Sequence, residues 1–488
     1  MPKRYKANCL VANLSALLTA MVLQACSISP QKVEPSCEVI LSSVDTLLHE
    51  HVGSLKGERV HNQASLRHNR FIHFFIGNQD LAEPSAPTQS QLIDYMGELA
   101  EQGLKAEWKT LDVDIANKWK AEYQITQPEQ TIEQCINELN QQLQGHSRQT
   151  AELLATIPID NDYSATAKVF GLYPLSSKVF ASAIEKEQQH LAEGWLAASR
   201  SSLSGFTAKQ AALYLPEPSL AKVNATDLQL DAFGQLASKQ QQVTLLKWYA
   251  PQWLVENNTA DNVPGVPVWQ KQQLAFEHSK PLSFSHITYA RHNNQTTIQL
   301  NYILWFKQRP KLSSVDWVAG EHDALIFRIH LTNKLEVIAY DSIHLCGCWY
   351  TLMLPQQRSY HAIQDSKVES VLMHRVNAAD KVRISISADA HQIIDLQPTG
   401  DIAEVVAKTT YTLQPWQSLL ALEKGQGYKS IYDSNGYVWG SERFERWFFW
   451  PMGVKQPGSL RRFGDHAISF VGERYFDQVH LLEDLGVQ

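Results

Sequence analysis

After its first 25 residues the sequence of 488 residues has no long apolar run. A membrane-spanning helix needs about 20 such residues, so we predict none in the body of the protein. Positive charge is not in excess either, since 43 lysines and arginines face 50 aspartates and glutamates. The formal net charge of -7 makes the chain a poor nucleic-acid binder, and we expect no nucleic-acid partner. Internal repeats are also lacking, and the length allows two or three globular domains.

Known catalytic motifs are absent as well. Serine-hydrolase, zinc-protease and phosphate-loop patterns do not occur, and Gly425-Gln426-Gly427 lacks the third glycine and the strand-helix context of a phosphate loop. No pair of carboxylates has neighbours that would mark it for glycoside hydrolysis. The sequence therefore assigns no reaction, although the lack of a motif does not exclude an enzyme.

The first residues have the layout of a signal peptide. Lys3, Arg4 and Lys6 precede an uncharged stretch over residues 7–25, and Leu23-Gln24-Ala25-Cys26 closes it. This ending resembles the lipobox of bacterial lipoproteins, in which the cysteine thiol receives diacylglycerol and becomes the first residue of the mature chain. The resemblance implies a signal peptide over 1–25 and a fatty-acyl (palmitate-type) anchor on Cys26.

The predicted anchor implies a subcellular location for the protein. Residues 26–36 form a short polar tether, so we expect the body to lie outside the cytoplasm, in the periplasm and close to a membrane. Ser27, rather than aspartate, follows Cys26, which favours the outer membrane over the inner membrane. Removing residues 1–25 takes away three cations and no anion and leaves a formal charge of about -10. An envelope glycan or lipid is the class of ligand that we expect at this location.

Four cysteines remain once Cys9 leaves with the signal peptide and Cys26 is lipidated. An oxidising compartment favours disulfides, and four thiols allow three pairings. We predict one bridge between Cys37 and Cys135, which would close a long loop. The other two thiols are Cys346 and Cys348.

Hydrophobic spacing predicts an α+β protein with a mostly helical N-terminal half over residues 37–261. Helices are expected from Cys37 to Val52, after an N-cap at Ser90, and from Thr131 to Leu143. Helical character continues from Ser177 to Ala197 and to about residue 245. The segment 262–267, Asn-Val-Pro-Gly-Val-Pro, marks the predicted domain boundary.

Residues 268–488 are predicted to form an antiparallel β-rich half. The period changes to two over Thr297–Phe306, Ala324–Leu331 and Leu335–Tyr340, with a hairpin turn at 332–334. Further strand-like runs occur at 381–387 and 404–412. The last fifty residues are rich in aromatic residues and arginine, and we expect an irregular segment packed on one of the halves.

A candidate metal site lies at the end of a predicted strand. His344, Cys346 and Cys348 alternate and would project from one face of an extended chain, about 7 Å apart. Imidazole and thiolate suit zinc or copper, with Asp323 as a further ligand. The alternatives are a structural role for the two thiols, paired or free, and a redox-active dithiol. A regular strand cannot hold a Cys346–Cys348 disulfide, but Gly347 would allow the necessary kink.

The C-terminal tail offers a weaker candidate for anion binding. Arg461, Arg462 and Arg474 lie among aromatic residues, a mixture that suits carboxylates, phosphates or sugar faces. Acidic residues are interleaved with them, so intramolecular ion pairing is the favoured interpretation.

Several segments resemble uncharacterised proteobacterial lipoproteins, and the likeness runs over most of the mature chain. The resemblance supports the lipid anchor and implies no activity, cofactor or catalytic residue. The segments are 66–71, 171–175, 300–306, 340–344 with Cys346-Gly347-Cys348, and 470–474.

Three functional hypotheses follow. The first is a non-catalytic binding or structural lipoprotein of the envelope. The second is a metal-dependent envelope hydrolase at His344, Cys346 and Cys348, in which the metal would activate water and a carboxylate would act as base. The third is a thiol-disulfide redox protein.

Overall fold

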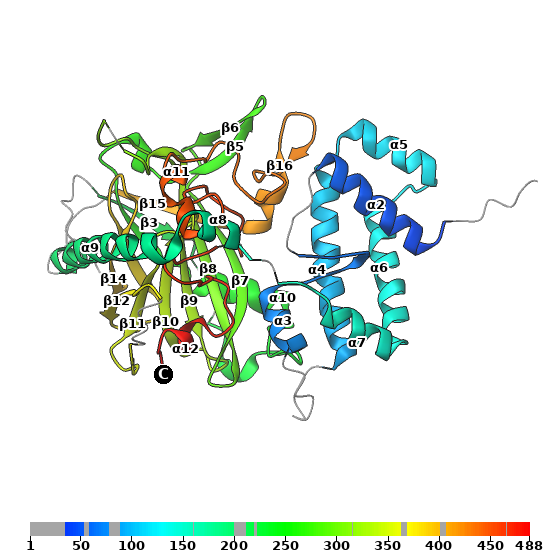
Figure 1. Ribbon diagram of the computed structural model, residues 1–488, viewed down its shortest axis with the longest axis horizontal. Coiled ribbons are helices and arrows are strands. Elements are labelled where there is room, and N and C mark those ends of the chain that lie inside the picture. Colours follow the sequence, from blue (N-terminus) through cyan, green and yellow to red (C-terminus); the bar gives the residue numbers. More distant parts are fainter. Residues whose placement is uncertain are drawn as a thin grey trace, which may run out of the picture.

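The computed structural model describes residues 35–52, 58–77, 88–159, 161–199, 211–218, 222–314, 316–362, 368–400, 407–464 and 466–488. The predicted signal peptide, Cys26 and most of the tether lie outside these ranges. In Figure 1 a group of helices occupies one end of the molecule and a large sheet occupies the other, with α3 (Arg70–Gly77) and α10 (Lys239–Trp248) where the two meet. No helix among the described residues is both long and apolar enough to cross a membrane.

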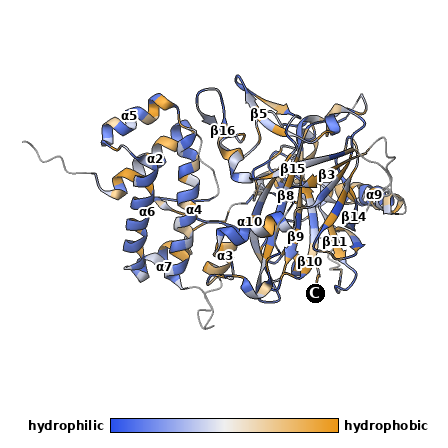
Figure 2. Ribbon diagram, turned by 180° about the vertical axis from the view of Figure 1, so that it is seen from behind, coloured by the Kyte–Doolittle hydropathy of each residue, from blue (hydrophilic) through white to orange (hydrophobic). Residues whose placement is uncertain are grey.

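The helical unit surrounds a small apolar core. Three helices provide most of it, and Ile40, Leu104 and Ile132 are among its buried residues. The helices are α2 (Cys37–His51), α4 (Gln89–Lys109), α5 (Val113–Tyr123), α6 (Pro128–Gln144) and α7 (Ser147–Ala155), with a hairpin of β1 (Arg59–Val60) and β2 (Gln63–Arg67). Figure 2 shows that hydrophilic residues dominate the outer faces of these helices, whereas apolar positions recur along the strands of the sheet.

The predicted helices over 37–52 and 131–143 correspond to α2 and α6. The helix expected after Ser90 begins two residues earlier, because Thr88 is the N-cap and forms a capping box with Gln91. The Thr88 side chain accepts from the Gln91 backbone N–H, and the Gln91 side chain accepts from the Thr88 backbone N–H. Two backbone donors at this end of the helix are thus satisfied, which fixes its start. A disulfide joins Cys37 of α2 to Cys135 of α6, the pair named from the sequence, across a separation of 98 residues.

The large sheet has eleven strands in the order β12-β11-β10-β9-β8-β7-β15-β3-β4-β13-β14. Their bounds are β3 (Ala211–Pro216), β4 (Gln252–Glu256), β7 (Leu282–His292), β8 (Gln295–Arg309), β9 (Gly320–Leu331), β10 (Val337–His344), β11 (Thr351–Pro355), β12 (Leu372–Val376), β13 (Val382–Ile386), β14 (Ile393–Pro398) and β15 (Ala407–Pro415). Outside the sheet lie the hairpins β5 (Val266–Gln270) with β6 (Gln273–Glu277) and β16 (Leu422–Glu423) with β17 (Tyr428–Lys429).

The sheet is mixed, whereas we expected antiparallel pairing. Neighbours from β7 to β11 are antiparallel. The pairs β11-β12, β4-β13, β15-β3 and β15-β7 are parallel. The strand β15 pairs with β3 through its first half and with β7 through its second half, so one strand joins the two parts of the sheet.

The predicted boundary at 262–267 does not separate helices from strands. Both β3 and β4 precede it and are inner strands of the sheet. The long helix α9 (Tyr173–Ser199) also belongs to the sheet body, because Trp195 packs in the core of one sheet face and stacks on His374 at 4.0 Å. The helical unit proper therefore ends before residue 165.

Both faces of the central strands are covered, which explains their long runs of buried residues. Along β8, Ile303 and Trp305 point into one core and Tyr302, Leu304 and Phe306 into the other. The second of these cores is closed by α9 and α10. The first is closed by the C-terminal segment 416–487, which includes the short helices α11 (Arg446–Phe449) and α12 (Leu481–Asp484). The predicted irregular tail is thus a layer of the fold.

We predict that the Cys37–Cys135 disulfide is a major support of the helical unit. Replacing either cysteine by serine should lower the free energy of unfolding by about 4 kcal/mol, because opening a loop of this length restores much chain entropy to the unfolded state. Urea denaturation followed by far-UV circular dichroism measures the loss. The double variant should lose no more than either single one, and an unchanged urea midpoint in all three would contradict the prediction.

Candidate functional site

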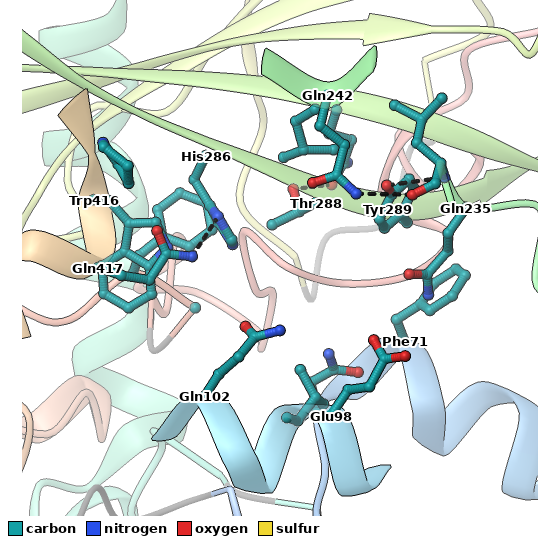
Figure 3. A pocket seen from close by; sticks show the side chains of 18 of the residues that line it. Phe71, Glu98, Gln102, Gln235, Gln242, His286, Thr288, Tyr289, Trp416 and Gln417 are labelled. Atoms are coloured by element: carbon teal, nitrogen blue, oxygen red, sulfur yellow. Dashed lines mark hydrogen bonds between the residues drawn. The ribbon is translucent and has the colours of Figure 1, made fainter. Parts of the chain in front are cut away.

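A cleft of about 700 Å³ lies between the helical unit and the sheet. One side is α4, the other is formed by β7 with the end of β15, and the loop before α10 and the tail around Phe463 complete it. Figure 3 shows Glu98 and Gln102 on the α4 side, facing His286, Thr288 and Tyr289 from β7. The position between two structural units is a common one for ligand sites, and its volume falls within the usual range.

Helical spacing explains the α4 wall. Leu92, Met96 and Leu104 are buried in the cores of the helical unit. Residues four apart lie on one helix face, so Glu98 and Gln102 share the opposite face and remain exposed toward the cleft. One stripe of α4 therefore holds the unit together, while the other lines the cleft.

The β7 wall is fixed by polar contacts. The Gln417 side chain lies 3.3 Å from His286 Nδ1, and the rings of Trp416 and Phe463 both pack edge-on against the imidazole. Thr288 Oγ1 donates to Gln299 Oε1 at 2.8 Å. These contacts hold the imidazole, the amide and the indole in place before any ligand arrives.

The loop before α10 forms the third wall. The Asp231 carboxylate accepts hydrogen bonds from the backbone N–H groups of Phe233 and Gln235, both at 2.8 Å, so this carboxylate closes a turn. Gln242 Nε2 donates to the Leu236 carbonyl at 2.8 Å, and the Leu236 N–H donates to the Tyr289 hydroxyl at 3.1 Å. The loop is thereby tied to both α10 and β7.

Burial shifts the pKa values of three titratable groups of the cleft toward the uncharged form. It lowers the pKa of His286 to about 3, so the imidazole is uncharged near neutral pH. It also raises the pKa of Glu98 against the opposing effect of Lys239, and Asp231 adds to the rise. The pKa of Asp231 is raised by burial too, although three backbone hydrogen bonds oppose the shift.

The predicted metal ligands lie elsewhere, on the buried side of β9 and β10. Asp323 accepts from Arg443 Nη2 at 2.9 Å, lies 2.8 Å from His391 Nδ1 and is 3.6 Å from His344 Nδ1. Burial alone would raise the pKa of Asp323, but Arg443 and His344 outweigh it and hold this pKa well below its usual range. The carboxylate is therefore already neutralised by a protein cation.

Cys346 and Cys348 are free thiols next to this network, Cys346 buried and Cys348 partly exposed. The described residues contain no group of three or more His, Cys, Asp or Glu side chains arranged to hold a metal ion. The structure thus brings His344 to Asp323 and Cys346 to Cys348, without assembling all four around one point.

The three arginines proposed for anion binding are engaged within the protein. Arg461 pairs with Asp162, and Arg462 Nη1 lies 3.1 Å from Glu58. Arg474 donates to the Glu369 carbonyl at 3.3 Å. Arg461 and Arg462 are also almost fully buried, so the tail arginines hold segments together, which is the alternative that the interleaved acids favoured.

Sequence reasoning missed the cleft. Its walls come from α3, α4, α10, β7, β15 and the tail, which are far apart along the chain. One local signal was present: Gln91, Glu98 and Gln102 repeat at helical spacing opposite the apolar stripe of α4. Such a stripe is ordinarily a solvated face, so it did not stand out.

Comparisons with known proteins add no family to this geometry. No family model matches the chain, and neither the curated proteins nor the solved structures yield a significant match.

We predict that His286 makes folding sensitive to acid. The folded pKa near 3 lies below the ordinary value of 6.5, so the unfolded chain takes up a proton first. The stabilisation is fully present above pH 6.5 and is lost as the pH falls toward 3, by about 1 kcal/mol per pH unit. Urea midpoints between pH 7 and pH 5 should fall less steeply for His286→Gln than for the parent protein. The exposed His190, replaced in the same way, is the matched control, and parallel curves for all three proteins would refute the assignment.

Proposed function

We propose that this protein is a lipid-anchored protein of the bacterial envelope that binds a neutral oligosaccharide in the cleft between α4 and β7. The observation that carries the ligand class is the lining of the cleft, in which amide side chains and aromatic rings recur on every wall. The anchor rests on the sequence up to Cys26, and Ser27 favours the outer membrane.

Amides and rings are the groups that recognise sugars. An amide side chain donates and accepts hydrogen bonds, as a sugar hydroxyl does, so one type of residue can serve many hydroxyls. An aromatic ring gives a flat apolar surface with little conformational freedom to lose. The amides are Asn69, Gln91, Gln102, Gln235, Gln242, Gln299, Gln414 and Gln417, and the rings are Phe71, Tyr95, Phe233, Tyr289, Trp416 and Phe463.

The charges of the cleft argue for a neutral ligand. The lining has no excess of positive charge, since four cations stand against five acids: Arg70, Lys239, Lys247 and Arg462 against Glu58, Asp94, Glu98, Asp231 and Asp477. Arg70 lies 3.1 Å from Asp477, and Arg462 lies 3.1 Å from Glu58, so both arginines are paired with acids of the same lining. An anionic phosphate or carboxylate would have to displace these pairs. Glu98, which faces the opening, would repel an anion but can accept from a hydroxyl.

A glycan-binding lipoprotein of this kind requires neither a metal nor a catalytic group. This is the first of the three hypotheses drawn from the sequence, with the ligand class made specific. The metal-dependent hydrolase has no comparable support, because its carboxylate Asp323 is held by Arg443.

We expect the full-length protein, purified in detergent, to bind a tetrasaccharide of β-1,4-linked N-acetylglucosamine. Trp416→Ala and Gln102→Ala should each weaken binding about tenfold or more, because each removes a central contact worth roughly 1.4 kcal/mol. Isothermal titration calorimetry measures the affinity, and mass spectrometry of the sugar afterwards shows whether it was cleaved.

The matched control is Trp269→Ala, which removes an indole as buried as that of Trp416 (9% against 8% exposed) that does not line the cleft. Binding that is equally weakened by the control, or that occurs with a phospholipid micelle and with no neutral oligosaccharide tested, would overturn the glycan assignment.

The anchor is tested separately. Cys26→Ala should abolish metabolic labelling with a palmitate analogue and block removal of the signal peptide, because the thiol that receives the lipid is gone. Labelling, intact mass and membrane fractionation of cells that express the two forms measure this. An unlabelled parent protein with an amino terminus at Met1 would contradict the lipoprotein assignment.

A further inference from the structure

The turn after β10 brings two thiols together. Gly347 N–H donates to the His344 carbonyl at 2.8 Å, and His344 N–H donates to the Cys348 carbonyl at 3.0 Å. Gly347 has φ +88, and a Cβ at this position would lie 2.3 Å from the Ala467 carbonyl oxygen, so only glycine fits here. Within this closed turn the Cys346 and Cys348 side chains are close enough to affect each other's titration.

We propose that Cys346 and Cys348 are a reversible dithiol–disulfide pair that exchanges with the disulfide of a small molecule or a partner protein. The regular strand geometry that would keep alternate side chains about 7 Å apart ends at His344. The left-handed conformation at Gly347 replaces it with a turn in which the sulfurs are neighbours. This site is distinct from the cleft and does not depend on the glycan-binding function.

Cations support thiolate character at the buried member of the pair. Burial alone would raise the pKa of Cys346, but the hydrogen bond from Cys348 and the positive charge of Arg443 lower it, while Glu445 opposes them. The same hydrogen bond raises the pKa of Cys348 well above its ordinary value. The two thiols are therefore coupled, and loss of a proton from the pair gives the thiolate that disulfide exchange requires.

The different exposure of the two thiols indicates which one attacks first. Cys346 is 3% exposed, whereas Cys348 is partly exposed and can meet another disulfide. Cys348 loses its proton to solvent and its Sγ attacks a disulfide RS–SR, so that a mixed disulfide forms and one RS⁻ leaves and is protonated by water. Cys346 then loses its own proton to solvent and attacks Cys348 Sγ. The second RS⁻ leaves, so the two thiols have been oxidised and RSSR has been reduced to two RSH.

The other disulfide of the chain is an internal control. Cys135 is 2% exposed and packs in the core of the helical unit, so the Cys37–Cys135 bond should resist a reductant while the protein stays folded. Only the thiols at 346 and 348 should then change state under native conditions.

The test uses the full-length protein treated with glutathione disulfide, quenched in acid, and alkylated with a maleimide after unfolding. We expect two alkylated thiols before oxidation and none afterwards. Dithiothreitol added to the folded protein should restore both thiols. Cys346→Ser should accumulate a glutathione mixed disulfide on Cys348, whereas Cys348→Ser should accumulate far less on the buried Cys346. Alanine variants at both positions serve as further controls. Circular dichroism of each variant, compared with the parent protein, shows whether the fold is kept.

Three results would overturn the assignment. The thiols could both remain alkylatable after oxidation. The pair could be isolated as a disulfide that dithiothreitol opens only in denaturant, which indicates a structural bridge. Finally, both thiols could be protected by one equivalent of tightly bound zinc, which indicates a metal site instead.

Discussion

Two ion pairs buried in the sheet hold the C-terminal segment in place, and most of the structure described above depends on them. Arg328 of β9 is paired with Asp341 of β10 at 2.5 Å, and it also donates to the Phe476 carbonyl at 2.6 Å. Asp323 of β9 receives Arg443 from the same segment. A layer with so little regular structure of its own needs such fixed points, because buried backbone groups must find partners outside helices and strands.

These ion pairs are costly to break, because removing one member leaves the other charged and buried. Burial alone would raise the pKa of Asp341, yet Arg328 and His330 keep it well below its usual range. Breaking a buried pair of this kind ordinarily costs about 3 to 5 kcal/mol. The positions of Phe463 in the cleft and of Ala467 over the Cys346–Cys348 turn both follow from a segment anchored in this way.

Local patterns in the sequence predicted the elements that have a single repeating period. The helices at Cys37–His51 and Pro128–Gln144 carry clean apolar stripes, and the Cys37–Cys135 disulfide joins these two helices. The strands β3 and β4 were missed because five or six apolar residues do not distinguish a strand from a buried helical turn. Their parallel partners, β15 and β13, lie more than a hundred residues away, so no local signal gives the pairing or the mixed character of the sheet.

The candidate site shows the same division between local and distant information. Sequence reasoning singled out His344, Cys346 and Cys348 because rare, reactive side chains stand close together in the chain, and the structure does keep the two thiols adjacent. The cleft is built instead from common residues, glutamines and aromatic rings, that only the fold assembles. A ligand site whose chemistry rests on many weak, neutral contacts leaves no dense motif, because each contact can come from a different element. The packing of the helical unit against β7 therefore determines which residues face the ligand. This packing depends in turn on the C-terminal segment, which Asp323 and Asp341 hold on the sheet.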